Sequence, residues 1–81
     1  MALICEKDWE AASKALKGRD RFTLTRTLGS VEMTVSVEPA GKGWEIPMVI
    51  GVMLKIGGEI RTRQWCSDIE QAKETVRRWG R

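Results

Sequence analysis

Three side chains in the segment 59–66 are well suited to binding. Arg61, Arg63 and Trp65 occupy alternate positions, and alternate residues of a β-strand share one face. Two guanidinium groups and an indole in a row can bind phosphates, carboxylates or stacked bases. The alternative is that the two arginines form a solvated pair that protects a strand edge, while Trp65 packs against the sheet.

Other basic residues could extend this candidate binding patch. They are Lys55 in the preceding strand-like segment and Arg77, Arg78 and Arg81 near the end of the chain. The net charge of +3 is unevenly distributed, because residues 1–54 hold seven Lys/Arg and seven Asp/Glu whereas residues 55–81 hold seven and four. An acidic partner is therefore expected to contact the last third of the chain.

The sequence offers little means of catalysis. It contains no histidine and no tyrosine, which removes the commonest general base and metal ligand. Cys5 and Cys66 lack the paired spacing of a zinc site, and the Gly-Lys-Gly of residues 41–43 does not match a phosphate-binding loop. We expect a protein that is not an enzyme and has no metal or other cofactor. A cysteine nucleophile assisted by a lysine or a carboxylate is the remaining catalytic alternative.

The two cysteines also bear on the cellular compartment. The chain reaches charge after five residues, and no apolar run approaches the length of about 18 that spans a bilayer. We therefore expect a soluble, cytoplasmic protein in which Cys5 and Cys66 are reduced and partly buried. A disulfide between them is the alternative if both lie at the same end of the fold.

The first half of the chain predicts a helix followed by a β-hairpin. Residues 8–17 place Trp9 at helical spacing with two further apolar residues, with Asp8 as the N-cap and Gly18 as the stop. Residues 21–28 and 31–38 alternate between apolar and polar around Gly29-Ser30, which indicates a two-residue turn. That turn predicts the cross-strand pairs Leu28–Val31, Arg26–Met33, Thr25–Thr34, Leu24–Val35, Phe22–Val37 and Arg21–Glu38. Arg26 then falls on the apolar face, where its guanidinium must reach an edge or a partner.

The second half predicts two strands and a helix. A long central strand is expected over residues 44–56, with a bend or bulge near Pro47 or Gly51. Gly57-Gly58 turns the chain into a strand over residues 59–66, whose register the sequence leaves open. Residues 67–70 (Ser-Asp-Ile-Glu) form a capping box, followed by an apolar stripe at Ile69, Ala72, Val76 and Trp79.

These elements predict one α+β domain over residues 1–81. The order is helix, three or four antiparallel strands, helix, with both helices packed on one face of the sheet. The other sheet face is then free for solvent or a partner. Trp9 and Trp79 lie on helical stripes that must be buried, so Trp44 and Trp65 are the tryptophans that remain for recognition.

In its size, its lack of catalytic residues and its closing helix (Ser-x-x-Glu-Gln-Ala-Lys…Trp, residues 67–79), the chain resembles small phage and mobile-element proteins of the anti-CRISPR kind. The resemblance implies an inhibitor that occludes a surface of a larger protein or nucleoprotein complex. Such inhibitors are often acidic, and the charge of +3 departs from that pattern, which favours occlusion of a protein surface over mimicry of DNA.

The alternative function is nucleic-acid binding. The order of helix, strands and helix is also that of the double-stranded-RNA-binding domain. That domain has a lysine-rich start to its second helix, whereas the acidic Asp68 and Glu70 stand at this place here. A macromolecular target without a role for the membrane is expected in either case, and the oligomeric state is left open.

Overall fold

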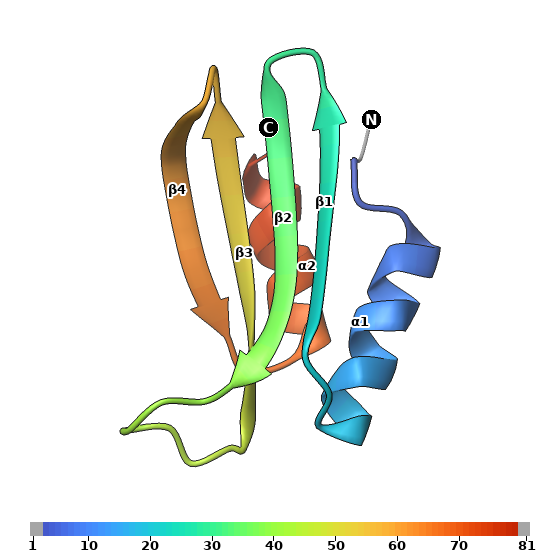
Figure 1. Cartoon of the computed structure of the whole chain (residues 1–81), viewed down its shortest axis with the longest axis vertical. Helices are drawn as coiled ribbons and strands as arrows, with labels where there is room; N and C mark the ends of the chain where they lie inside the picture. The colour runs from blue at the N-terminus through green and yellow to red at the C-terminus, as the bar shows by residue number, and fades with distance from the viewer. Residues whose placement is uncertain (1–2, 80–81) are drawn as a thin grey trace.

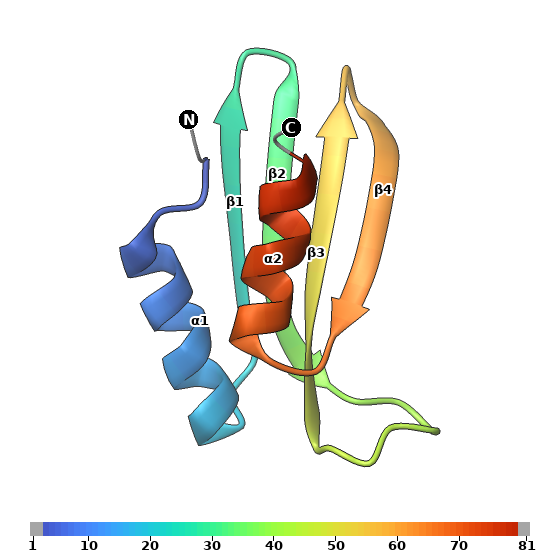
Figure 2. The ribbon, with the colours of Figure 1, turned by 180° about the vertical axis from the view of Figure 1, so that it is seen from behind.

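Four antiparallel strands form one open sheet that carries both helices on one face (Figures 1 and 2). The computed structural model describes residues 3–79. Its elements are α1 (Glu6–Gly18), β1 (Phe22–Leu28), β2 (Val31–Pro39), β3 (Met48–Ile56), β4 (Glu59–Cys66) and α2 (Ile69–Trp79). The strand order is β1-β2-β3-β4, so each strand pairs with its neighbour in sequence. The α+β fold predicted from the sequence is confirmed, with four strands.

The β1–β2 hairpin has the register that the sequence predicts. Leu28 pairs with Val31 across the turn, and Gly29 adopts the left-handed conformation (φ 62°) that such a turn requires. On the polar side, the hydroxyl groups of Thr25 and Thr34 lie 3.1 Å apart and share a hydrogen bond. One predicted pair, Arg21–Glu38, does not form: β1 begins only at Phe22, which pairs with Val37, so Arg21 lies outside the strand.

Strand β3 begins later than predicted. It starts at Met48, because residues 40–47 form a loop that the Ala40 N–H closes by donating to the Pro47 carbonyl at 2.9 Å. Gly51 pairs regularly with Ser36 and Trp65, so the expected bend does not occur there. The irregularity lies between Leu54 and Lys55, opposite β4.

Strand β4 is paired through a tight turn and contains a bulge. Gly57 and Gly58 have φ values of 61° and 84°, which suits a two-residue turn and pairs Ile56 with Glu59. The next pair, Lys55 with Ile60, keeps this register, and beyond it the register shifts by one residue, which leaves Arg61 as the extra residue of a β-bulge. The register that the sequence left open is therefore set by the turn and then displaced by the bulge.

Both helices begin at positions other than those predicted. Helix α1 starts at Glu6 with Cys5 as the N-cap, and the Asp8 carboxylate accepts a hydrogen bond from the Cys5 N–H at 3.1 Å. Helix α2 starts at Ile69, one residue later than a Ser67 cap requires. The Asp68 carboxylate caps it by accepting from the Gln71 N–H at 2.8 Å, and the Gln71 side chain accepts from the Ser67 N–H at 2.8 Å. The capping residues are thus Asp68 and Gln71 in place of Ser67 and Glu70.

The hydrophobic core lies between the helices and the sheet. Its buried residues are Ile4, Trp9, Ala12, Met33, Val35, Val37, Met48, Ile50, Val52, Cys66, Ala72 and Val76. Ile69 and Trp79 of the α2 stripe are partly buried against this core, as the helical spacing predicts. Both cysteines are free thiols, with Cys5 exposed and Cys66 buried. Burial raises the pKa of the Cys66 thiol, whose sulfur lies 3.9 Å from the Thr75 hydroxyl.

An ion pair connects α1 to the edge strand. The Arg26 guanidinium donates to the Asp8 carboxylate from Nη2 at 2.9 Å and from Nε at 3.3 Å. These bonds explain how the charged Arg26 is accommodated on the apolar face, opposite Met33. They also hold the pKa of the buried Asp8 carboxyl at about 2, below its ordinary value of 3.8.

Candidate interaction surface on the open sheet face

One face of the sheet carries no helix and exposes a row of short polar side chains. The side chains that point away from the core include Thr25 of β1, Thr34 and Ser36 of β2, and Trp65 of β4. The strand alternation places them there, because their neighbours Leu24, Val35, Val37 and Cys66 contact the helices. The predicted free face therefore exists, and Figure 1 views it with α2 behind the strands.

The indole of Trp65 lies across Gly51 of the neighbouring strand. A Cβ atom at position 51 would be only 2.6 Å from Cζ3 of the ring and 3.0 Å from the Ser36 hydroxyl oxygen. Because Gly51 has no side chain, the Trp65 ring can lie directly over this position of the sheet. The residue remains 37% exposed, so part of the indole is accessible to a partner.

Arg63 lies beside Trp65 on the same face. Its guanidinium carbon lies 5.1 Å from the centre of the indole ring, which is within the range of a cation–π interaction. The two side chains border a small hollow of about 60 Å³, whose other walls include Thr34, Ser36 and Met53. This arrangement presents a planar cation, an aromatic ring and two hydroxyl groups to one ligand.

Arg61 does not follow the alternation on which its prediction rested. Lys55 pairs with Ile60 and Leu54 pairs with Thr62, so Arg61 has no partner in the ladder. Its side chain is exposed, but the bulge breaks the period of two that would place it in line with Arg63. Of the three residues singled out on this strand, the structure brings together Arg63 and Trp65.

Lys55 lies on the same face but forms an ion pair with a carboxylate. It pairs with Glu32 across β2 and β3, and its ammonium lies 3.9 Å from the Glu32 carboxylate. Glu38 lies further along the same face of β2. The face thus holds two carboxylates against the two cations Lys55 and Arg63, so it is close to neutral overall.

Of the three remaining predicted residues, Arg81 lies outside the described residues 3–79, and the other two lie elsewhere. Arg77 and Arg78 belong to α2, which packs on the opposite face of the sheet (Figure 2). Arg77 forms an ion pair with Glu74 one turn earlier. The basic end of α2 therefore does not extend the Trp65 surface, and the two regions would contact a partner separately.

Sequence reasoning missed the part that Gly51 plays at this surface. A glycine in the middle of a strand signals either a bulge or a close approach of another group, and the prediction for Gly51 was a bend or bulge. The decisive information was the β3–β4 register, which pairs Gly51 with Trp65.

The described residues show neither a cluster of ligands for a metal ion nor a helix that could cross a membrane. Within residues 3–79, no group of three or more His, Cys, Asp and Glu side chains is placed to hold a metal ion. In the same range no helix has the length and apolar character to cross a membrane. No known protein family, no curated protein and no solved structure matches the chain.

Proposed function

We propose that this protein is a non-catalytic binding protein that contacts a larger protein or nucleoprotein target through its open sheet face. The observation that carries the proposal is the partly exposed Trp65 indole, seated on Gly51 with the Arg63 guanidinium over its ring. Tryptophan and arginine are the residues that most often dominate the energetics of protein interfaces. A ring already held in place loses little conformational entropy on binding.

The charge of this face favours a protein surface over bare nucleic acid. Nucleic-acid binding is driven largely by basic residues that neutralise phosphates. Here Glu32 pairs with Lys55, and Glu38 adds a second carboxylate to the face that holds Arg63. A mixed face of this kind suits a partner that also carries both signs of charge. With the likeness to small phage inhibitors, this favours occlusion of a functional surface on the target as the mode of action.

Nucleic-acid binding is the second candidate, because a base could stack on Trp65 beside Arg63. The two candidates differ in their dependence on salt. We expect no binding of generic single-stranded RNA, double-stranded RNA or DNA at low ionic strength. Affinity for any of these that falls steeply with added salt would favour the second candidate.

The proposal is tested by affinity capture with two matched tryptophan variants. Trp65→Ala removes the indole of the open face, whereas Trp44→Ala removes an indole of similar exposure, 42%, from the 40–47 loop. Wild type and Trp44→Ala are expected to retain the same protein, and Trp65→Ala is expected to lose it. Capture of that protein by all three forms at equal yield would place the interface elsewhere.

A further inference from the structure

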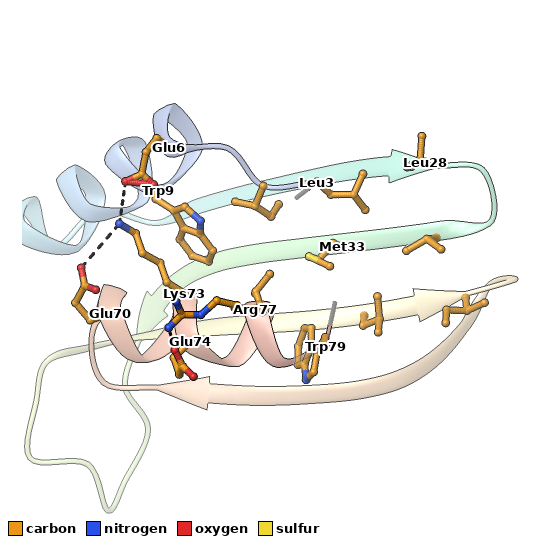
Figure 3. A pocket seen from close by; sticks show the side chains of 15 residues that line it. Leu3, Glu6, Trp9, Leu28, Met33, Glu70, Lys73, Glu74, Arg77 and Trp79 are labelled. Carbon is orange, nitrogen blue, oxygen red and sulfur yellow. Dashed lines mark hydrogen bonds and ion pairs between the residues drawn. The ribbon is translucent and has the colours of Figure 1, made fainter. Parts of the chain in front are cut away.

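A groove of about 980 Å³ runs along the helix-covered side of the sheet. Its floor is formed by Met33 and Val31 of β2 with Leu54 and Ile56 of β3, and Figure 3 shows Met33 between its two sides. The segment before α1 and the start of α1 form one wall, with Leu3 and Trp9. The other wall is α2, with Trp79 near its end.

One end of the groove is apolar and open. Leu28, at the end of β1, is 56% exposed, and Ile56, at the end of β3, is 36% exposed. Both line the groove next to the turns that join the strands. Such exposed side chains, continuous with a partly covered core, are typical of a site where another apolar surface binds.

The other end is acidic and closed. Lys73 of α2 extends across to α1, where its ammonium lies 3.0 Å from the Glu6 carboxylate and 3.8 Å from that of Glu70 (Figure 3). The hydrogen bond to Glu6 raises the pKa of Lys73, and the charges of Glu6, Glu70 and Glu10 raise it further. The lining as a whole holds three carboxylates against the two cations Lys73 and Arg77, on a chain whose net charge is +3.

The floor also restricts the conformation of a peptide bound there. Strands β2 and β3 are the inner strands of the sheet, so their backbone groups are already paired on both sides. An extended peptide placed over the floor would leave its own N–H and C=O groups without partners in an apolar environment, which is costly. A helix satisfies its backbone internally and presents only side chains.

From these observations we infer that the groove binds an amphipathic helix of a partner protein, with an apolar stripe toward Met33 and Leu54 and basic residues toward Glu6 and Glu70. This contact lies on the other side of the sheet from Trp65 and is independent of it. The acidic end selects a basic helix, because the two carboxylates Glu6 and Glu70 outnumber the single cation Lys73 there. The apolar end would cover Leu28 and Ile56.

The test uses two model helices that share one apolar stripe and differ in charge. One is a Leu–Lys peptide of about 14 residues and the other its Leu–Glu counterpart, each with apolar residues at helical spacing. Binding to the full chain is followed by NMR of methyl groups. The Leu–Lys peptide is expected to shift the methyl signals of Leu28, Val31 and Ile56, and to leave that of Val49 on the open face unchanged.

Two double variants separate the local charge from the net charge. Glu6→Lys with Glu70→Lys reverses the acidic end, whereas Glu38→Lys with Glu45→Lys makes the same change in net charge away from the groove. The first double variant is expected to weaken binding of the Leu–Lys peptide at least about tenfold and to strengthen binding of the Leu–Glu peptide. The second pair is expected to change either affinity less than about twofold.

Several results would overturn the inference. Equal affinity for both peptides, or equal effects of the two double variants, would remove the charge selectivity. If neither peptide shifts the groove methyl signals while the uncharged detergent dodecyl maltoside does, the groove is a site for small amphiphiles. If these signals depend on protein concentration alone, and sedimentation shows a dimer, the occupant is a second copy of the chain. Either result would rule out a partner helix as the occupant of the groove.

Discussion

The indole of Trp65 occupies the space that a side chain at Gly51 would fill on the adjacent strand. The two residues are direct partners in the β3–β4 register, and the Ser36 hydroxyl of β2 borders the same space. The orientation of the exposed ring is therefore determined by an inner strand and does not depend on Trp65 alone. This relationship makes the candidate interaction surface sensitive to a substitution that leaves every surface residue unchanged.

We predict that Gly51→Ala displaces the Trp65 ring. The added methyl group would lie 2.6 Å from Cζ3, which is shorter than a normal contact. Crowding of this kind costs about 1–3 kcal/mol in the free energy of unfolding. A red shift of the tryptophan emission and a lower denaturation midpoint are the expected measurements.

A double-mutant cycle tests the cause of this loss. With Trp65→Ala in the background the contact with the ring is absent, and only the rotatable Ser36 hydroxyl, 3.0 Å away, stays close to the added methyl group. Ala is favoured over Gly in a strand by about 0.5–1 kcal/mol. Gly51→Ala should then leave the stability unchanged or raise it. An equal loss in both backgrounds would show that Gly51 matters for a reason other than the ring.

The sequence predicts most of the fold because its strongest patterns are local. Strict alternation around Gly29-Ser30 determines the β1–β2 register, and the stripe through Ala72 and Val76 identifies the buried face of α2. The features that were missed depend on contacts between distant segments. Asp8 reads as an N-cap, but it accepts hydrogen bonds from Arg26, which is 18 residues away.

The candidate site was predictable in part for the same reason. Helical spacing assigns Trp9 and Trp79 to buried stripes, which left Trp44 and Trp65 as the predicted surface tryptophans. Both are exposed. The separation of Arg61 from Arg63 depends on a bulge that no local pattern signals. The position of Arg77 and Arg78 relative to Trp65 depends on which face α2 covers, and the sequence does not relate that face to the register of β4.

The Asp8–Arg26 ion pair makes stability depend on pH at the acid end. The pKa of Asp8 is about 2 in the folded protein and 3.8 ordinarily, so the pair contributes fully above about pH 4. This contribution is lost as the pH falls from about 4 through 2. We predict that Asp8→Asn lowers the urea midpoint at pH 7 and flattens its decline between pH 4 and 2.

Asp20→Asn is the matched control, because Asp20 is exposed and precedes β1. It should leave the midpoint and its pH profile close to those of wild type. If Asp8→Asn and wild type decline in parallel below pH 4, the ion pair does not hold α1 on the sheet in solution.

Trp79 should contribute far more to stability than Trp44. Trp79 is partly buried against the core, whereas Trp44 is exposed on the 40–47 loop. We predict a loss of about 3 kcal/mol in the free energy of unfolding for Trp79→Ala and less than about 0.5 kcal/mol for Trp44→Ala. Denaturant melts of the two variants measure this difference, and similar midpoints would mean that α2 does not pack as described.

The two thiols should react at different rates with an alkylating reagent. Cys5 is exposed, while Cys66 is buried and its thiol has a raised pKa, which disfavours the reactive thiolate. Iodoacetamide at pH 8 is expected to modify Cys5 first and Cys66 only after denaturant is added. Peptide mass spectrometry identifies the modified residue, and early labelling of Cys66 would indicate that the β4–α2 junction opens in the native state.

The most direct test of the proposed function is the affinity of the captured partner for surface variants, measured by titration calorimetry. Trp65→Ala and Arg63→Glu are each expected to weaken binding by at least about 2 kcal/mol, or roughly 30-fold. Trp44→Ala should bind as wild type does, and exposed charges contribute little to folding, so the arginine variant should keep its melting midpoint. Wild-type affinity in both a folded Trp65→Ala and a folded arginine variant would contradict the assignment of the interface to the open sheet face.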